Sequence, residues 1–527
     1  MTLTGMIRRL VKTSAAIIIL PIGAPVAAKT VRSIDVDLHQ ARKPVDRFFD
    51  LSIGSDFPGT LIRADSQAQL KVATRELGFR YIRFHAIFHD VLKTVRIVDG
   101  RIVYDWSKID QLYDDLLARN IKPFVELGFT PEALKTSDAS IFYWKGNTSH
   151  PKLDQWQLLI DAFARHLEQR YGAEQVRSWF FEVWNEPNLD GFWEKGDQKA
   201  YFELYDVTAR TLKSVDPALR VGGPATAGAA WVPEFLDHVA ANHVPVDFVT
   251  THTYGVDGGF LDEQGKSDTK LSPSPDAIIG DVRRVRQQIS ASKFPNLPLY
   301  FTEWSTSYTP RDAVHDSYVS APYILTKLKA ARGFVQGMSY WTYTDLFEEP
   351  GPPSAPFQGG FGLMNPQGIR KPAWFAYKYL NAIEGKEVPT SDPYSFASTD
   401  GRKTALLVWD WHQPDQKVSN RPFYTRLQPS RPEAPASLRF AGLKQGRYRM
   451  RTYRVGYRHN DAYSAYIDMK MPNSLTPAQV SKLQALTEDK PEGDRVIQVG
   501  AKGQLAVSVP LRTNDVVLVM LEPVTAR

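Results

Sequence analysis

Short apolar runs recur along the first three quarters of the chain, and most precede a stretch in which apolar residues follow helical spacing, such as SQAQLKVATRELG at 66–78. The runs are apolar on both faces, as expected of parallel strands that are buried on both sides. Eight strand–helix units in succession predict a (β/α)8 TIM barrel, an α/β fold, over residues 45–385. The eight predicted strands are 48–55, 81–88, 121–129, 179–187, 220–227, 246–254, 298–305 and 337–345.

A doubly wound open sheet is the alternative arrangement of alternating strands and helices. That fold would place a glycine-rich phosphate-binding turn after its first strand. No such turn follows the run at 48–55, so the barrel is preferred.

The pattern changes after residue 385, where helical spacing fades and short strand-like segments such as GRYRMRTYRVG and DVVLVMLEP are separated by proline and polar residues. This pattern predicts a β-sandwich domain over residues 386–527, interrupted by one helix-like insert, TPAQVSKLQALTED. Residues 29–44 precede the barrel and alternate in a strand-like way, and we expect them to join the sandwich.

The N-terminus has the three parts of a secretory signal peptide. Arg8, Arg9 and Lys12 form a basic region, residues 14–22 are apolar, and small residues precede a cleavage point near Ala28. We predict a signal peptide over residues 1–28 and an exported protein, periplasmic or extracellular, with no membrane attachment after cleavage. An uncleaved signal anchor is the alternative. Because the chain has no cysteine, its stability outside the cytosol must come from packing.

The composition is that of an ordinary globular protein, with 43% hydrophobic and 23% charged residues in 527. The formal charge of +6 is modest, and three of the positive charges lie in the predicted signal peptide. No basic stripe indicates a nucleic-acid partner. Oligomeric state is left open.

In a barrel, side chains at the carboxyl ends of the strands face the active site. Glu186 closes the fourth predicted strand and Glu303 lies late in the seventh, each beside a tryptophan. These strands lie on opposite sides of the barrel mouth, so the two carboxylates can converge on one bound molecule. Further chemistry-bearing residues at strand ends are His85, Glu126, Asn185, His252, Tyr254, Trp341 and Asp345.

Two converging carboxylates with aromatic neighbours suit glycoside hydrolysis. One carboxyl, kept protonated, donates to the leaving oxygen, and the other attacks the anomeric carbon or activates water. A lone glutamate at a strand end is more often an ion-pair partner, but the pair on strands four and seven favours catalysis. Glu182 has the same strand parity as Glu186, so we expect it to point into the barrel and to require a partner there.

No metal or cofactor is expected. His85 and His89 are four residues apart, which would suit zinc only on a helix, and the chain has no HExxH motif.

Two motifs, WNEPN at 184–188 and TEW at 302–304, resemble the signature of retaining (β/α)8 glycosidases with catalytic carboxylates on strands four and seven. More narrowly, the chain is similar to glycoside hydrolase family 39, which contains β-xylosidases and α-L-iduronidases. The segments that carry this resemblance include RYIRFHAIFHD, FEVWNEPNLDGFW, THTY, FTEWSTSY, YWTYTDLFEE and YRHNDAYSAYIDM. The resemblance covers most of the chain after the predicted signal peptide.

The resemblance implies roles for particular residues. Glu186 would be the general acid/base, Glu303 the nucleophile, and Asn185 the partner of the sugar 2-hydroxyl. The two carboxyl groups would lie about 5–5.5 Å apart, as a retaining mechanism requires. The residues expected to line the glycone pocket are His85, Phe129, His252 and Tyr254, and those expected to close over the sugar are Trp341, Glu348 and Glu349.

The leading hypothesis is an exported retaining exo-glycosidase that removes β-linked xylose from the non-reducing end of xylo-oligosaccharides by double displacement. The long segment at 345–363 is expected to wall off the site and to favour exo action. An α-L-iduronidase is an alternative that would need a cation near the sugar carboxylate, with Arg83 and Lys145 as candidates. Endo action on an exopolysaccharide and a non-catalytic carbohydrate-binding barrel are the remaining alternatives.

Overall fold

The computed structural model describes residues 31–524. The predicted signal peptide therefore lies outside the described residues. Within this part of the chain, no helix combines the length and the continuous apolar character that a membrane crossing requires.

Eight parallel strands close into a barrel, in the order in which they occur along the chain. This confirms the predicted fold class. The barrel strands are β2 (Ser52–Gly54), β3 (Tyr81–Phe84), β6 (Lys122–Leu127), β9 (Phe180–Val183), β10 (Arg220–Thr226), β11 (Phe248–Tyr254), β14 (Leu299–Ser305) and β15 (Gly337–Tyr340).

A helix follows each barrel strand and packs its apolar face on the outside of the barrel. The principal helices are α2 (Ala64–Leu77), α3 (Ser107–Leu117), α4 (Leu153–Tyr171), α6 (Gln198–Val215), α7 (Val232–Ala241), α8 (Ile279–Ala291), α9 (Ser320–Ala331) and α10 (Pro372–Asn381). Three small hairpins leave the barrel: β4 (Val95–Val98) with β5 (Arg101–Tyr104), β7 (Ser140–Ile141) with β8 (Gly146–Asn147), and β12 (Val256–Leu261) with β13 (Ser267–Leu271).

Several strands are shorter than predicted at the end that carries the polar residues. The prediction of strand at 85–88, 184–187 and 341–345 is wrong, because β3, β9 and β15 end at Phe84, Val183 and Tyr340. At two of these ends the backbone turns through residues with positive φ: Ala86 at 57°, Trp184 at 69° and Glu186 at 46°. Positive φ is uncommon for residues other than glycine and clusters at functional sites.

The interior of the barrel is closed by aromatic rings at the end where the strands begin. Phe124 and Phe180 stack with ring centroids 4.6 Å apart. Phe248 and Tyr300 meet Phe180 edge-on at 5.4 and 5.1 Å. These rings form a separate buried cluster, so this end of the interior is an apolar plug.

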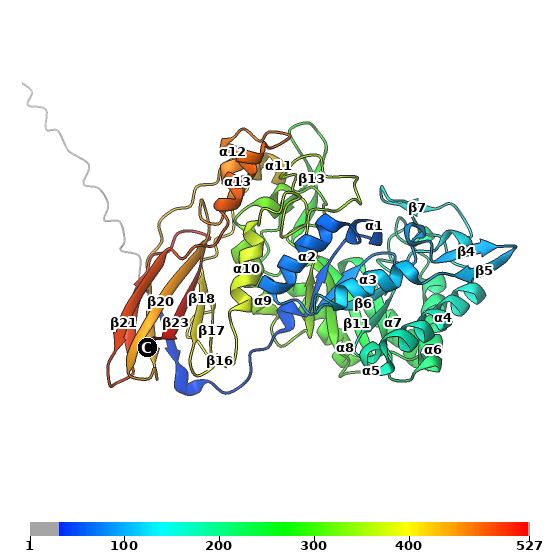
Figure 1. The fold of residues 1–527 in the computed structure, drawn as a ribbon, viewed down its shortest axis with the longest axis horizontal. Coiled ribbons are helices and arrows are strands. Elements are labelled where there is room, and N and C mark those ends of the chain that lie inside the picture. The colour runs from blue at the N-terminus through cyan, green and yellow to red at the C-terminus, as the bar shows by residue number, and fades with distance from the viewer. Residues whose placement is uncertain (1–30, 525–527) are drawn as a thin grey trace, which may run out of the picture.

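The C-terminal region contains two sheets that share one apolar core, as in a β-sandwich. The larger sheet is antiparallel, in the order β16 (Lys386–Val388), β17 (Ser395–Thr399), β18 (Thr404–Trp409), β23 (Val516–Pro523), β20 (Gly446–Val455) and β21 (Gly493–Val499). The smaller sheet contains β19 (Ala436–Ala441), β22 (Leu505–Val509) and β1 (Arg32–Asp37), which runs parallel to β19. The N-terminal strand β1 thus belongs to the sandwich, and the chain then crosses to the barrel, as the blue segment in Figure 1 shows.

The sandwich packs firmly against the barrel. The indole of Trp409 on β18 donates to Thr326 Oγ1 on α9 at 2.9 Å, and Tyr379 on α10 donates to Asp489 at 2.7 Å. Helix α12 (Ala462–Asp468), inserted between sandwich strands, places Tyr466 against Phe357 in the loop after β15, with ring centroids 5.0 Å apart. The sandwich therefore supports the loop that follows the last barrel strand.

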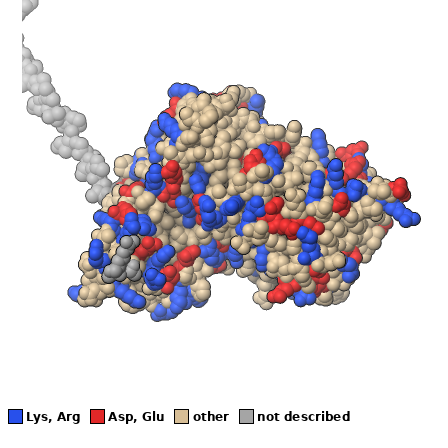
Figure 2. Space-filling model, viewed as in Figure 1, with Lys and Arg blue, Asp and Glu red and all other residues tan. Residues whose placement is uncertain are grey.

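The surface carries both signs of charge. On the face shown in Figure 2, basic and acidic side chains lie beside one another over the barrel and the sandwich alike.

Candidate active site

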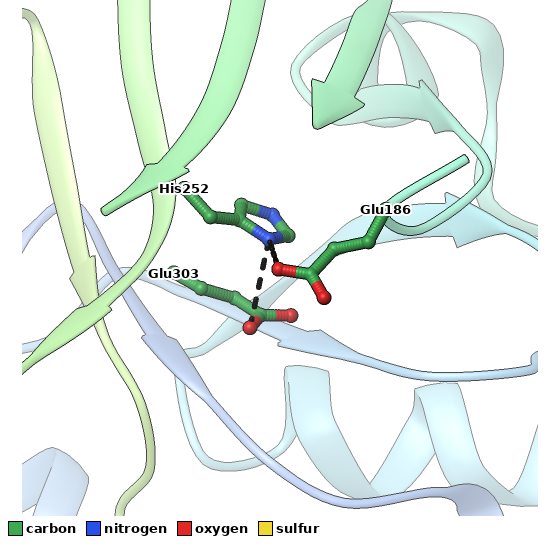
Figure 3. A group of neighbouring side chains, drawn as sticks. All are labelled: Glu186, His252 and Glu303. Atoms are coloured by element: carbon green, nitrogen blue, oxygen red, sulfur yellow. Dashed lines mark hydrogen bonds and ion pairs between the residues drawn. The ribbon is translucent and has the colours of Figure 1, made fainter. Parts of the chain in front are cut away.

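Glu186 and Glu303 meet at the barrel mouth (Figure 3). Glu303 lies within β14, and Glu186 lies three residues after β9, where the positive φ of its own backbone turns the chain. One carboxylate oxygen of each residue lies within 4.8 Å of the other, with the His252 ring between the strands that carry them. The sequence prediction that the two carboxylates converge is correct in geometry.

Both oxygens of Glu303 accept hydrogen bonds from strong donors. Arg83 Nη1 donates to Oε1 at 2.6 Å, and the Tyr254 hydroxyl donates to Oε2 at 2.8 Å. Hydrogen bonds of this kind, one from a permanent cation, stabilise a carboxylate. Burial and the neighbouring Glu303 and Glu186 raise the pKa of Tyr254 well above its usual value, so its proton is firmly held.

Glu186 has a different environment. Its Oε1 lies 2.9 Å from Nδ1 of His252, and no cationic side chain bonds to it within the described residues. Burial raises the pKa of Glu186 to about 7, although the nearby charges of His85 and Arg83 oppose the rise. Burial also lowers the pKa of His252 to about 4, so the ring is neutral near pH 7. The two glutamates are therefore suited to opposite protonation states.

Arg83 lies beneath the site and is completely buried. Besides Glu303, its guanidinium contacts Glu182 at 2.5 Å, Glu126 at 3.1 Å and the Asn185 side-chain oxygen at 2.8 Å. Glu182 thus points into the barrel and has the partner that the sequence required. The guanidinium charge of Arg83 is therefore paired with carboxylates inside the barrel.

His85 connects two further carboxylates. Its Nδ1 lies 2.6 Å from Glu126 Oε2, and its Nε2 lies 3.1 Å from Glu349 Oε1. Burial alone would lower the pKa of His85, but the combined attraction of Glu126 and Glu349 outweighs burial and raises the pKa well above its usual value. Burial raises the pKa of Glu349 to about 7.

These residues border a pocket of about 620 Å³, within the size range of small-molecule sites. The predicted site residues that line it are His85, Asn185, Glu186, Tyr254, Glu303, Trp341 and Glu349. Gly54 on β2 is necessary for this arrangement, because a Cβ there would lie 2.2 Å from the Trp341 ring.

Three predicted pocket residues do not line the pocket. Phe129 is buried behind it, edge-on to Trp144 at 5.4 Å. His252 lies beneath the carboxylates and contacts them instead. Glu348 points away and pairs with Arg63 at 3.0 Å. Asp345 is likewise withdrawn, because it pairs with the buried Lys371 at 3.0 Å.

The aromatic rim of the pocket was not predicted from the sequence. Phe142, Phe192, Tyr308 and Phe361 line it from four separate loops. Phe192 lies in the segment NLDGFW that directly follows the NEP motif, which was an available signal. Tyr308 ends the segment FTEWSTSY, and Phe361 lies in the segment 345–363 that was expected to wall off the site. Phe142 lies outside these segments, and only the fold brings it to the mouth.

Glu186, His252 and Glu303 are close enough together to ligate a cation. The donors already present oppose this use of the group. Arg83 and Tyr254 occupy both oxygens of Glu303, and the guanidinium charge only 2.6 Å from one of them repels a metal ion. The donor set fits an internal hydrogen-bond network better than a metal centre.

The barrel carries two glutamates at the ends of its fourth and seventh strands, and the comparisons with known proteins identify the family. The profile described as "Glycosyl hydrolases family 39" matches residues 32–505. The chain therefore belongs to glycoside hydrolase family 39 and is a glycoside hydrolase, which confirms the predicted resemblance.

Among curated relatives, the chain is 36% identical over 499 residues to a β-xylosidase from Geobacillus stearothermophilus, covering 92% of this chain and 94% of the relative. A crystal structure of a monomeric β-xylosidase from Caulobacter crescentus CB15 is 71% identical, with a TM-score of 0.93 and coverage of 94% of this chain and all of that one. A family 39 enzyme from Xanthomonas axonopodis pv. citri is 66% identical, with a TM-score of 0.94 and coverage of 96% and 100%.

Proposed function

We propose that the protein is a retaining exo-β-xylosidase that releases xylose from the non-reducing end of xylo-oligosaccharides through a covalent glycosyl-enzyme intermediate. The β-xylosidases to which the chain is similar support this substrate class. The observation that carries the mechanism is the pair of carboxylates in one pocket, with oxygens within 4.8 Å. Retaining enzymes hold their carboxyls about 5–5.5 Å apart, whereas inverting enzymes need about 6.5–9.5 Å.

In the first step Glu186 donates its proton to the glycosidic oxygen as the bond from that oxygen to the anomeric carbon breaks. An oxygen of Glu303 attacks the anomeric carbon from the opposite face and forms the glycosyl ester. In the second step Glu186, now a carboxylate, takes a proton from water while the water oxygen attacks the anomeric carbon and releases Glu303. Two inversions restore the original configuration.

Asn185 is suited to hold the sugar 2-hydroxyl. Arg83 donates to its side-chain oxygen at 2.8 Å, which fixes the orientation of the amide. The amide NH2 group remains to donate to a hydroxyl, and such a bond strengthens as positive charge develops on the sugar. On the other side of the pocket, Glu349 can accept from sugar hydroxyls while His85 holds it.

Exo action is supported by the loop between β15 and α10, from which Glu349, Pro350 and Phe361 line the pocket. Phe357 in the same loop is held by α12 of the sandwich. A wall of this kind limits how many sugars extend beyond the cleaved one on the non-reducing side.

A uronic acid substrate, the α-L-iduronidase alternative, is less well supported. Within the described residues, the pocket lining contains neither lysine nor arginine. Arg83 is committed to four protein partners beneath the site, and Lys145 does not line the pocket. The positive charge of His85 is balanced by Glu126 and Glu349.

The test is a rate comparison on aryl β-xyloside, β-glucoside, α-L-arabinoside and α-L-iduronide, with the anomer of the first product followed by NMR. We expect preference for the β-xyloside and β-xylose as the first product. In Glu186→Ala, kcat/KM on a xyloside with a good leaving group should change little, whereas kcat should fall because the second step lacks its base. Azide should restore kcat and give β-xylosyl azide. Glu348→Ala, the same change at a glutamate that points away from the pocket and pairs with Arg63, is the matched control, and no azide product is expected from it. Inactivity on all four substrates, or α-xylose as the first product, would contradict the proposal.

Export is part of the same proposal and is supported by the composition of residues 1–28. Fractionation of the producing cells should recover the enzyme outside the cytosol with a mature N-terminus near Lys29. Recovery of an intact N-terminus in the membrane fraction would favour the uncleaved anchor.

A further inference from the structure

We propose that Thr302 and Glu182 are positioning residues that hold His252 as the Nε2–H tautomer. Its Nδ1 then accepts a hydrogen bond from protonated Glu186 and stabilises the acid form that the first catalytic step needs. The inference rests on the function proposed above, which makes Glu186 the acid. It adds a role for residues that do not touch the sugar.

The direction of each hydrogen bond in this series follows from Arg83, which can only donate. Arg83 Nε donates to Glu182 Oε2 at 2.5 Å, so the Glu182 carboxylate is an acceptor. Thr302 Oγ1 lies 2.7 Å from the other oxygen, Oε1, and must use its single hydroxyl hydrogen there. Towards His252, Thr302 can therefore only accept.

Nε2 of His252 lies 3.2 Å from Thr302 Oγ1 and must carry a hydrogen to make that bond. A neutral imidazole has one N–H, so Nδ1 then presents only a lone pair. Glu186 Oε1, 2.9 Å from Nδ1, must be the donor in this contact, which is possible only when Glu186 is protonated. The contact that Figure 3 draws between His252 and Glu186 is then a carboxyl O–H to nitrogen bond rather than an ion pair.

The alternative is an imidazolium paired with an ionised Glu186. His252 is completely buried, which disfavours a charged ring. Glu303, whose Oε2 lies 3.6 Å from Nδ1, and Glu182 attract a charge on His252, whereas Arg83 and His85 repel it. Burial outweighs the sum of these effects and lowers the pKa of His252 to about 4.

The arrangement joins the two reacting carboxylates in one network. Arg83 donates directly to Glu303. It also donates to Glu182, which accepts from Thr302, and Thr302 in turn accepts from His252. This series determines that the proton between His252 and Glu186 lies on the carboxyl group. The same residue thus holds Glu303 directly and, through the series of hydrogen bonds, turns a lone pair of His252 towards Glu186, although its charge alone favours the ionised form of Glu186.

Thr302→Val tests whether Thr302 fixes the tautomer of His252, because it keeps the β-branched shape and removes the hydroxyl that accepts from Nε2. His252 can then adopt the Nδ1–H tautomer and donate to an ionised Glu186, which lowers the pKa of the acid. We expect the alkaline limb of kcat/KM to move to lower pH by about one unit. At pH 7.5 we expect about a tenfold loss on aryl xylosides with poor leaving groups and little loss on those with good ones.

Two variants accompany it. Thr302→Ser keeps the hydroxyl and should restore the position of the alkaline limb. Thr250→Val makes the same change on the neighbouring strand β11, at a buried hydroxyl with no hydrogen-bond partner in residues 31–524, and should leave the limb in place. An unmoved limb in Thr302→Val, or an equal loss across all leaving groups, would overturn the proposal.

A second measurement is independent of any substrate. Nitrogen-15 NMR of the histidine rings, with the His252 signals identified by their loss in His252→Gln, reports the tautomer directly. We expect a protonated Nε2 and an unprotonated Nδ1 from pH 5.5 to 7.5. An imidazolium or an Nδ1–H tautomer at pH 7 would overturn the proposal. Inactivity on every xyloside together with the Nε2–H tautomer would instead refute only the proposed function.

Discussion

The two ends of the barrel interior are filled by side chains of opposite kinds. Where the strands begin, Phe124, Phe180 and Phe248 form an apolar plug. Where the strands end, Arg83 on β3 is surrounded by carboxylates from three other strands, β6, β9 and β14. The plug is ordinary core, whereas the charged end is costly to bury and is tolerated because its members satisfy one another.

The difference indicates how this fold separates stability from function. Aromatic burial at one end supplies free energy without any demand for precise hydrogen bonding. The charged end needs each partner in place, and the water excluded there strengthens every electrostatic interaction. Substitutions at the plug should therefore affect folding, and substitutions at the charged end should affect chemistry.

The largest effect is expected from Glu303→Ala. Loss of the proposed nucleophile should lower kcat on an aryl β-xyloside by about 10⁴-fold or more while the thermal midpoint changes little. Steady-state kinetics with added azide and a thermal melt measure both quantities. Retention of more than a hundredth of the wild-type kcat would exclude Glu303 as the nucleophile.

Arg83→Met should lower both the stability of the fold and the activity. Three buried carboxylates lose their counter-ion, which we expect to cost about 3–5 kcal/mol in the free energy of unfolding and to abolish measurable activity. Arg80→Met, three residues earlier with a side chain 52% exposed, is the matched control and should cost less than about 1 kcal/mol. Denaturant unfolding of the two variants provides the comparison, and equal costs would refute the assigned role of Arg83.

Phe180→Ala removes the central ring of the plug. We expect a loss of about 3–4 kcal/mol in the free energy of unfolding, because a buried cavity replaces the ring. The folded fraction should keep kcat within a few-fold and the pH profile of the wild type. A shifted pH profile in this variant would show that the two ends of the barrel are not independent.

The smallest effect is expected from a pair of identical changes at the two ends. Tyr254→Phe removes the hydrogen bond to Glu303 Oε2 and should lower kcat about tenfold. Tyr300→Phe, at the plug, should leave kcat within about twofold, since its ring packs against Phe180 far from the carboxylates. The measurement is kcat of both variants at one pH. Equal losses of kcat would contradict the separation of stability and function between the two ends of the barrel.

Much of the site was predictable because the polar residues interrupt apolar strands at a fixed place. Glu186 and Glu303 stand out against the runs that precede them, and the order of eight strand–helix units places them across the barrel mouth. What could not be predicted is which residues pair. Arg83 lies 99 residues from Glu182 and 220 from Glu303, so no local pattern connects them.

The errors have the same origin. Phe129 and Glu348 lie in motifs that border the site, but contacts with other loops decide which way each side chain faces: Trp144 packs against Phe129, and Arg63 pairs with Glu348. Positive φ at Glu186 turns that residue inward, and no residue type in the motif required such a conformation.

The sequence by itself determined the eight-stranded barrel, the separate C-terminal β-region and the two strand ends that carry glutamates, because these depend on local periodicity and on chain order. The tertiary structure decided that Glu303 accepts hydrogen bonds from Arg83 and Tyr254, that the Glu186 carboxyl group lies against His252, and that four loops supply an aromatic rim. Protonation depends on distances of a few ångströms between side chains that are remote in sequence. Only the closed barrel fixes those distances.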